Sequence, residues 1–208
     1  KEITGADCCI AVMSGNFVQR GIPAITDKYK RCRAAVDSGV NLVVELPLFY
    51  AVSSAEIFAA GAVATLNALN ASFISFGCEN ADIQMLKKIA ITLVNEPDEY
   101  KKHLKKALTC GDSFPTARAK ALSGFFKSDN ISRLISSPNN ILAIEYIKEI
   151  IKSESAVIPV ALTRKISGYH DSEIHENIAS ASAIRKILHD SGIHKNNDSH
   201  CKNIKELQ

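Results

Sequence analysis

The sequence predicts an α/β protein in which helices cover a parallel β-sheet. Four short apolar runs, rich in β-branched residues, predict buried strands at residues 8–13, 41–47, 72–77 and 156–162. Helical patterns lie between them, and the runs are apolar on both faces, as in parallel sheets whose two faces are buried. This alternation of strand and helix is typical of α/β folds.

The first two helices have recognisable start and stop signals. The first is expected at residues 26–39, with Thr26 at its start and Gly39 at its end. The second, at residues 53–70, has a serine cap and a carboxylate, Glu56, in its first turn.

The chain between the third and fourth predicted strands is mainly helical. Four helical patterns fill residues 82–152, and Pro97 and Pro138 occupy first-turn positions. We therefore expect one Rossmann-like domain over residues 1–190, interrupted by this helical insertion. Residues 191–208 are polar without a sustained period, which predicts a frayed tail.

The composition is that of a globular protein and excludes several classes. Of 208 residues, 46% are hydrophobic and 23% are charged, with a net charge of +3. No stretch is long and apolar enough for a membrane span and no secretory signal is visible, so we expect a cytoplasmic protein. The six cysteines have no C-x-x-C spacing, so no metal site is expected.

Candidate ligand-binding residues follow the strands, because α/β sheets bind ligands beyond the carboxyl ends of their strands. Gly15, in "SGNFVQRG", allows close backbone approach to a ligand, although a simple polar turn is the alternative. Gly77, in "FGCEN", would let a purine or ribose lie against the backbone, with a plain turn as the alternative. In "SPNNIL", Asn139 and Asn140 are candidate ligand contacts, and the alternative is that they only satisfy free amides at a helix start.

The strongest local signal is "IASASAIRK", which predicts a phosphate-binding helix N-terminus. If Ser180 or Ser182 caps this helix, its free amides face the same point as Arg185. The helix dipole favours an anion by about 0.3–1 kcal/mol, and arginine hydrogen bonds add about 1.5–3 kcal/mol. The alternative is a capped amphipathic helix with a solvated arginine.

Several uncommon strings join these pieces and, in this order, resemble the bacterial tRNA(Met) cytidine acetate ligase family over residues 7 to about 188: "AVMSGNFVQRG", "LVVELPLFYAV", "FGCEN", "PNNILAIEYI", "GYHD" and "IASASAIRK". This family belongs to the nucleotidylyltransferase superfamily marked by an H-x-G-H motif. The resemblance implies that acetate attacks ATP, accompanied by Mg²⁺, to give acetyl-adenylate. The acetyl group then passes to N4 of the wobble cytidine of elongator tRNA(Met).

The resemblance also implies roles for individual residues. Gly77, Asn139 and Arg164 match family positions that contact ATP. The serine and arginine of "IASASAIRK", Ser180 and Arg185, match the signature that stabilises the phosphates, which agrees with the anion site inferred from the residues.

Two departures from the family bear on activity. The sequence lacks the family's first strand and its H-x-G-H histidines, as well as a large C-terminal region, so we expect a truncated or degenerate form with impaired catalysis. Two other functions stay open at this point: a small-molecule nucleotidylyltransferase and a non-catalytic nucleotide- or RNA-binding module.

Two basic clusters are candidates for contact with tRNA phosphates. Lys101, Lys102 and Lys105, with Lys106, fall largely on one helical face. Arg31 and Arg33 lie with Lys28 and Lys30 on the first predicted helix. A solvated helix face is the alternative for each cluster.

Overall fold

The computed structural model describes residues 1–128 and 130–164, and residues 1–163 of these form one compact unit. Its elements, in chain order, are β1 (Ile10–Ser14), α1 (Lys28–Asp37), β2 (Leu42–Leu46), α2 (Leu48–Ala51), α3 (Ala55–Ala68), β3 (Phe73–Cys78), α4 (Ile83–Asn95), α5 (Asp98–Thr109), α6 (Phe114–Phe126), α7 (Asn130–Leu134), α8 (Pro138–Lys152) and β4 (Ile158–Thr163).

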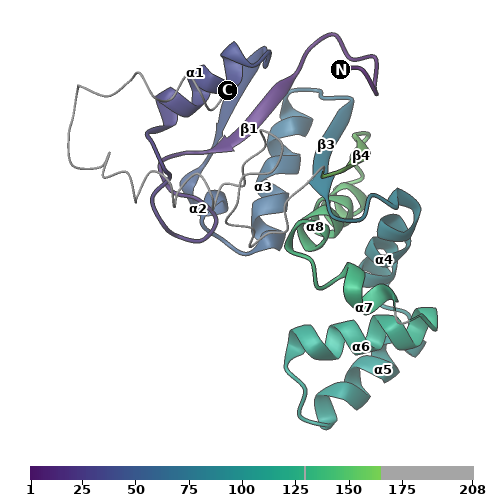
Figure 1. Ribbon diagram of the computed structural model, residues 1–208. Helices are drawn as coiled ribbons and strands as arrows, with labels where there is room; N and C mark the ends of the chain where they lie inside the picture. The colour runs from purple at the N-terminus through teal and green to yellow at the C-terminus, as the bar shows by residue number, and fades with distance from the viewer. Residues whose placement is uncertain (129, 165–208) are drawn as a thin grey trace. The chain divides into compact units, whose positions relative to one another are not determined.

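The four strands form two separate parallel pairs within the described part of the chain (Figure 1). Strand β1 pairs with β2 from Ile10 opposite Leu42 to Ser14 opposite Leu46. Strand β3 pairs with β4 from Phe73 opposite Ile158 to Cys78 opposite Thr163. Parallel strands joined through helices confirm the predicted α/β class, and each strand lies within two residues of its predicted position.

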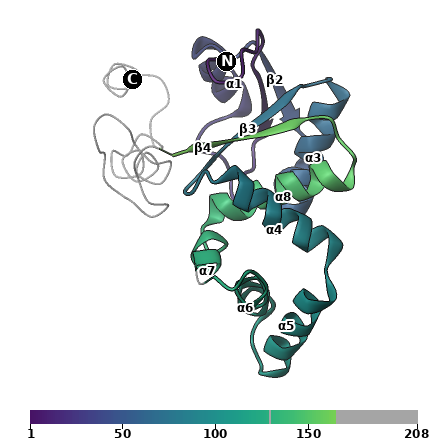
Figure 2. The ribbon, with the colours of Figure 1, turned by 90° about the vertical axis from the view of Figure 1, so that its right-hand side faces the viewer.

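The core lies between the β3–β4 pair and the helices beside it (Figure 2). Side chains of β3 alternate, so that Ile74, Phe76 and Cys78 are buried while Ser75 and Gly77 are exposed. The ring of Phe76 stacks on that of Tyr146 in α8, with 5.6 Å between ring centroids. The buried face of β3 therefore fixes α8 against the strand, and with it the N-terminus of α8.

The helix boundaries agree with the capping signals, with one correction. Helix α1 is capped by Asp27, whose side chain accepts hydrogen bonds from the N–H groups of Tyr29 and Lys30, so the expected start at Thr26 is wrong by one residue. Gly39 follows the end of α1 with a φ of 97°, a conformation that glycine adopts without strain. Ser54 caps α3 as expected.

Five helices, α4 to α8, run between β3 and β4. Helices α5 and α6 form a hairpin in which the imidazole of His103 lies against Gly124, where a Cβ would come within 2.9 Å of it. Arg118 of α6 donates to the buried carboxylate of Glu145 in α8 at 3.0 Å, and Lys148 donates to the same carboxylate at 2.5 Å. The part-buried ion pair between Arg118 and Glu145 thus connects the hairpin to α8.

Candidate functional site

The carboxyl ends of β3 and β4 lie side by side and carry two of the expected ATP-contacting residues. Gly77 pairs with Leu162 in the strand register, and its backbone is exposed. Arg164 directly follows β4 and its side chain is exposed. The sheet therefore places Gly77 at the edge where α/β folds bind their ligands.

A buried amide connects this edge to the N-terminus of α8. Asn140 is 1% exposed, and its Oδ1 accepts hydrogen bonds from the backbone N–H groups of Glu79 (3.0 Å) and Asn80 (3.2 Å). Its Nδ2 donates to the carbonyl oxygen of Leu134 at 2.9 Å. Asn140 thus satisfies amides of the β3–α4 loop and fixes that loop on α8.

Glu79, in the loop after β3, accepts hydrogen bonds from the first turn of α8. Its Oε1 accepts a hydrogen bond from Nδ2 of Asn139 at 2.8 Å, and its Oε2 accepts one from the backbone N–H of Asn140 at 3.2 Å. A carboxylate that contacts the first turn of a helix is stabilised by the free amides and by the helix dipole. Sequence reasoning missed Glu79, although a carboxylate directly after a strand was a visible signal.

Cys78 ends β3 but is not a nucleophile. The thiol is buried and lies 3.6 Å from the carbonyl oxygen of Leu162. Burial, and secondarily the charge of Glu79, raises the pKa of Cys78. The sulfur therefore stays protonated, and its role is packing.

At the other strand pair, the space beside Gly15 is occupied by a side chain of the same protein. A Cβ at Gly15 would overlap the carboxylate of Glu45, which lies against the glycine. Lys28 donates to Glu45 at 2.6 Å, and this hydrogen bond raises the pKa of Lys28. A cavity of about 270 Å³ beside this pair is lined by Met13, Ser14, Lys28, Tyr29, Cys32, Val43 and Glu45.

The two arginines of α1 have partners within the chain. Arg31 donates to the carbonyl oxygens of Ser14 and Gly15, so its guanidinium holds the end of β1. Arg33 donates to both carboxylate oxygens of Asp37, at 3.0 and 3.1 Å, on the exposed face of the helix. Arg31 is therefore needed for the loop after β1, whatever else it contacts.

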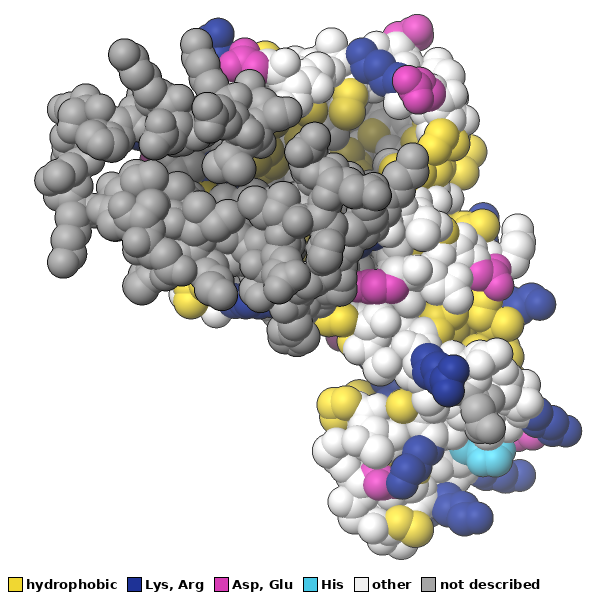
Figure 3. Space-filling model, in the orientation of Figure 1, with side chains coloured by type: hydrophobic (Ala, Val, Ile, Leu, Met, Phe, Trp, Pro, Cys, Tyr) yellow, Lys and Arg dark blue, Asp and Glu magenta, His cyan; other side chains and the backbone are white. Residues whose placement is uncertain are grey.

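The lysines of α5 lie on its exposed face. Lys101, Lys102 and Lys105 are exposed, while Tyr100 and Ala107 face the core. Figure 3 shows Lys and Arg side chains gathered on the α5–α6 hairpin, at the bottom of the view. None of the three lysines forms an ion pair with another residue in the described part of the chain.

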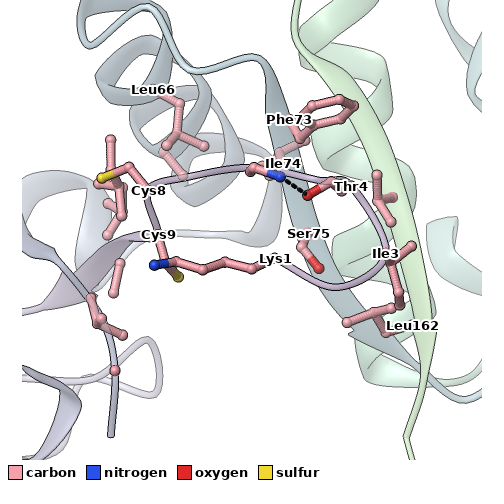
Figure 4. A pocket seen from close by; sticks show the side chains of 18 of the residues that line it. Lys1, Ile3, Thr4, Cys8, Cys9, Leu66, Phe73, Ile74, Ser75 and Leu162 are labelled. Atoms are coloured by element: carbon pink, nitrogen blue, oxygen red, sulfur yellow. Dashed lines mark hydrogen bonds between the residues drawn. The ribbon is translucent and has the colours of Figure 1, made fainter. Parts of the chain in front are cut away.

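A cavity of about 740 Å³ separates β1 from β3 (Figure 4). It is lined by both strands, by helix residues that include Phe58, Leu66 and Tyr146, and by N-terminal residues that include Lys1 and Ile3. Of the expected ATP contacts that the structure describes, Gly15, Gly77, Asn139 and Arg164, none lines it.

Three predicted phosphate-binding residues, Ser180, Ser182 and Arg185, lie outside the described residues. Among residues 1–128 and 130–164, no cluster of three or more His, Cys, Asp or Glu side chains is arranged to hold a metal ion. Over the same ranges, no helix has the length and apolar character needed to cross a bilayer.

Comparison with known families identifies the fold. Residues 1–207 match the family model of the HIGH nucleotidyl transferases. The chain belongs to this family.

Similar proteins of the HIGH nucleotidyl transferase family confirm the resemblance found in the sequence. The tRNA(Met) cytidine acetate ligase of Clostridium perfringens is 47% identical over 207 residues, which are 95% of this chain and 52% of that protein. The ligase of Clostridium novyi is 48% identical over 194 residues, which are 92% of this chain and 48% of that protein. The chain thus spans about half the length of the curated relatives it matches.

Two crystal structures of Thermotoga maritima TmcAL share this fold. The apo form matches with a TM-score of 0.88 and 36% identity, over 99% of this chain and 50% of that one. A form bound to alpha-thio ATP matches with a TM-score of 0.84 and 36% identity, over 93% of this chain and 46% of that one.

Proposed function

We propose that this chain is the nucleotide-binding part of an ATP-dependent tRNA(Met) cytidine acetate ligase. The observation that carries the proposal is the 47% identity to such a ligase across 95% of the chain. The solved relative bound to alpha-thio ATP supports a nucleotide as the ligand. In this reaction ATP, accompanied by Mg²⁺, activates acetate as acetyl-adenylate, and the acetyl group is then transferred to N4 of the wobble cytidine of elongator tRNA(Met).

The nucleotide is proposed to bind at the carboxyl edge of β3. The exposed backbone of Gly77 leaves room for a flat base or a ribose, because no side chain stands there. Asn139, in the first turn of α8, offers a side-chain amide at the positive end of a 15-residue helix. Arg164, Ser180, Ser182 and Arg185 are the proposed phosphate ligands, since cationic and hydroxyl groups stabilise the charge that develops on the phosphates.

We also propose that the cavity between β1 and β3 receives the strand that precedes the H-x-G-H motif in this family. Both pairs are parallel, and the cavity is lined by β1 and β3, whose second edges have no partner strand among the described residues. A strand placed there would pair with β1 on one side and with β3 on the other, at the usual spacing of about 4.8 Å.

The tRNA is proposed to lie along α5. Lys101, Lys102 and Lys105 are exposed on one face of the helix, which suits contact with successive phosphates. Arg31 and Arg33 are proposed as secondary contacts, since both already have partners in the chain. A tRNA substrate is consistent with a cytoplasmic protein.

Isotope exchange between pyrophosphate and ATP tests the reaction. A version extended at its N-terminus by the H-x-G-H segment of the Clostridium perfringens ligase should catalyse this exchange, and the exchange should require acetate. The 208-residue chain should catalyse little exchange. Exchange that requires a phosphorylated metabolite instead of acetate would show a small-molecule transferase. ATP binding without exchange by either version would show a binding module.

The salt dependence of tRNA binding tests the α5 surface. Replacing Lys101 and Lys105 together by Gln should lower affinity and reduce the slope of log K against log salt by about 2, because each lysine neutralises one phosphate. Replacing Lys87, which lies on α4, is the control. An unchanged slope in the double variant would exclude α5 as the tRNA surface.

A further inference from the structure

The side-chain amide of Asn139 has a nitrogen and an oxygen, and the nitrogen is hydrogen-bonded within the protein. Its Nδ2 donates to Oε1 of Glu79 at 2.8 Å. An ionised carboxylate has no proton to donate, so the amide atom that faces Glu79 must be the nitrogen. In the opposite orientation two acceptors would face each other, which is unfavourable.

This orientation leaves Oδ1 of Asn139 as an acceptor. Among residues 1–128 and 130–164, no donor is hydrogen-bonded to this oxygen. The residue is half-buried at the N-terminus of α8, beside the loop that follows β3. A ligand at the carboxyl edge of β3 therefore meets a fixed acceptor at this position.

The orientation of Asn139 is held by groups behind it. The buried Asn140 binds the backbone N–H groups of Glu79 and Asn80 and so fixes the loop from which the Glu79 carboxylate extends. That carboxylate also accepts the backbone N–H of Asn140 at 3.2 Å, which fixes its second oxygen. Asn140 and Glu79 are therefore positioning residues, and Asn139 is the side chain that they orient.

We propose that Oδ1 of Asn139 accepts a hydrogen bond from the exocyclic amino group of the nucleotide base, and that Glu79 imposes this preference. The inference rests on the proposed nucleotide site and adds how that site selects adenine. Adenine has an amino group at C6, whereas hypoxanthine has a carbonyl oxygen at the same place. A fixed acceptor attracts the first and faces an acceptor in the second.

The test compares the affinities of ATP and inosine triphosphate for the 208-residue chain by equilibrium dialysis. We expect the wild-type chain to bind ATP about tenfold more tightly, the worth of one hydrogen bond made or left unmade. In Glu79→Gln the ratio should fall towards one, because glutamine offers both a donor and an acceptor and allows the Asn139 amide to turn over. Asn139→Ala removes the acceptor and should lower the ratio as well.

A matched control and a folding check separate the possible outcomes. Glu99→Gln removes an exposed carboxylate from α5 and should keep the wild-type ratio. Circular dichroism verifies that each variant folds. If Glu79→Gln unfolds, Asn139→Ala still tests the inference, because it keeps the hydrogen bond from the Asn140 N–H to Glu79. Equal binding of the two nucleotides by the wild type, or an unchanged ratio in the variants, overturns the inference while the nucleotide site stands. Absence of binding by both nucleotides overturns the proposed site itself.

Discussion

The carboxyl ends of the two strand pairs carry the same residue types but use them differently. After β1, the polar groups bind one another: Glu45 covers Gly15 and pairs with Lys28, and Asn16 accepts the backbone N–H of Lys28 at 3.0 Å. After β3, a buried asparagine holds the loop and an acceptor on Asn139 remains unbound within the described residues.

The difference shows that residue types at a strand end do not by themselves identify a ligand site. At the end of the β1–β2 pair, Gly15, Asn16 and Glu45 contact their neighbours, and the ion pair there is solvent-accessible, with Lys28 and Glu45 side chains at 33% and 49% accessibility. At the end of β3 the holding group, Asn140, is fully buried. A loop held by a buried group, with a polar acceptor left over, is better suited to bind a ligand than an exposed cluster whose charged groups pair with each other.

The largest expected effect is a difference in stability loss between two alanine variants, one at an asparagine after each strand pair. Asn140→Ala should lower the free energy of unfolding by about 2–4 kcal/mol, because it leaves two part-buried loop amides and the buried Leu134 carbonyl without their partner. Asn16→Ala, at the exposed end of β1, should cost about 0.5–1 kcal/mol. Urea denaturation measures both, and similar losses would contradict the contrast between a buried and an exposed clamp.

An intermediate effect is expected from Gly15→Ala. The new methyl group would displace the Glu45 carboxylate, and we expect a loss of about 1 kcal/mol in stability, at the low end for overpacking since Glu45 is a flexible, half-exposed side chain. The double variant Gly15→Ala with Glu45→Ala should lose little more than Glu45→Ala alone, because the overlap is gone. ATP affinity should not change in the double variant. A fall in ATP affinity there would mean that a ligand contacts Gly15 directly.

Much of the fold was predictable because its signals are local. The apolar run 72–77 predicts a strand and corresponds to β3. Ser54 marks the start of α3 because its side chain caps the helix, and Gly39 follows the end of α1 because glycine adopts a positive φ. The start of α1 was misplaced by one residue because Thr26 and Asp27 are both good caps, and only the geometry shows which one accepts the amide bonds.

The site was less predictable because its partners are distant in sequence. Glu79 meets Asn139 and Asn140 across 60 and 61 positions, and no spacing rule joins a strand end to a helix that begins so much later. Asn139 and Asn140 also look equivalent in the sequence, yet one is buried and the other faces outward. Similarly, Arg31 looked free for a phosphate, although it donates to the backbone of a strand end 17 residues earlier.

The smallest expected effect concerns the ion pair at the end of β1. The hydrogen bond to Glu45 raises the pKa of Lys28 above its ordinary value of 10.5. The pair therefore contributes stability that is fully present below the pKa of the unfolded state and is lost as the pH rises through the higher pKa of the folded state. Since both side chains are exposed, salt should weaken this contribution. Carbon-13 NMR of labelled lysines should show Lys28 titrating at a higher pH in the wild type than in Glu45→Gln, which lacks the carboxylate. If Lys28 titrates at the same pH in the wild type and in Glu45→Gln, the end of the β1–β2 pair is more open than its hydrogen bonds indicate, and the contrast with β3 is weakened.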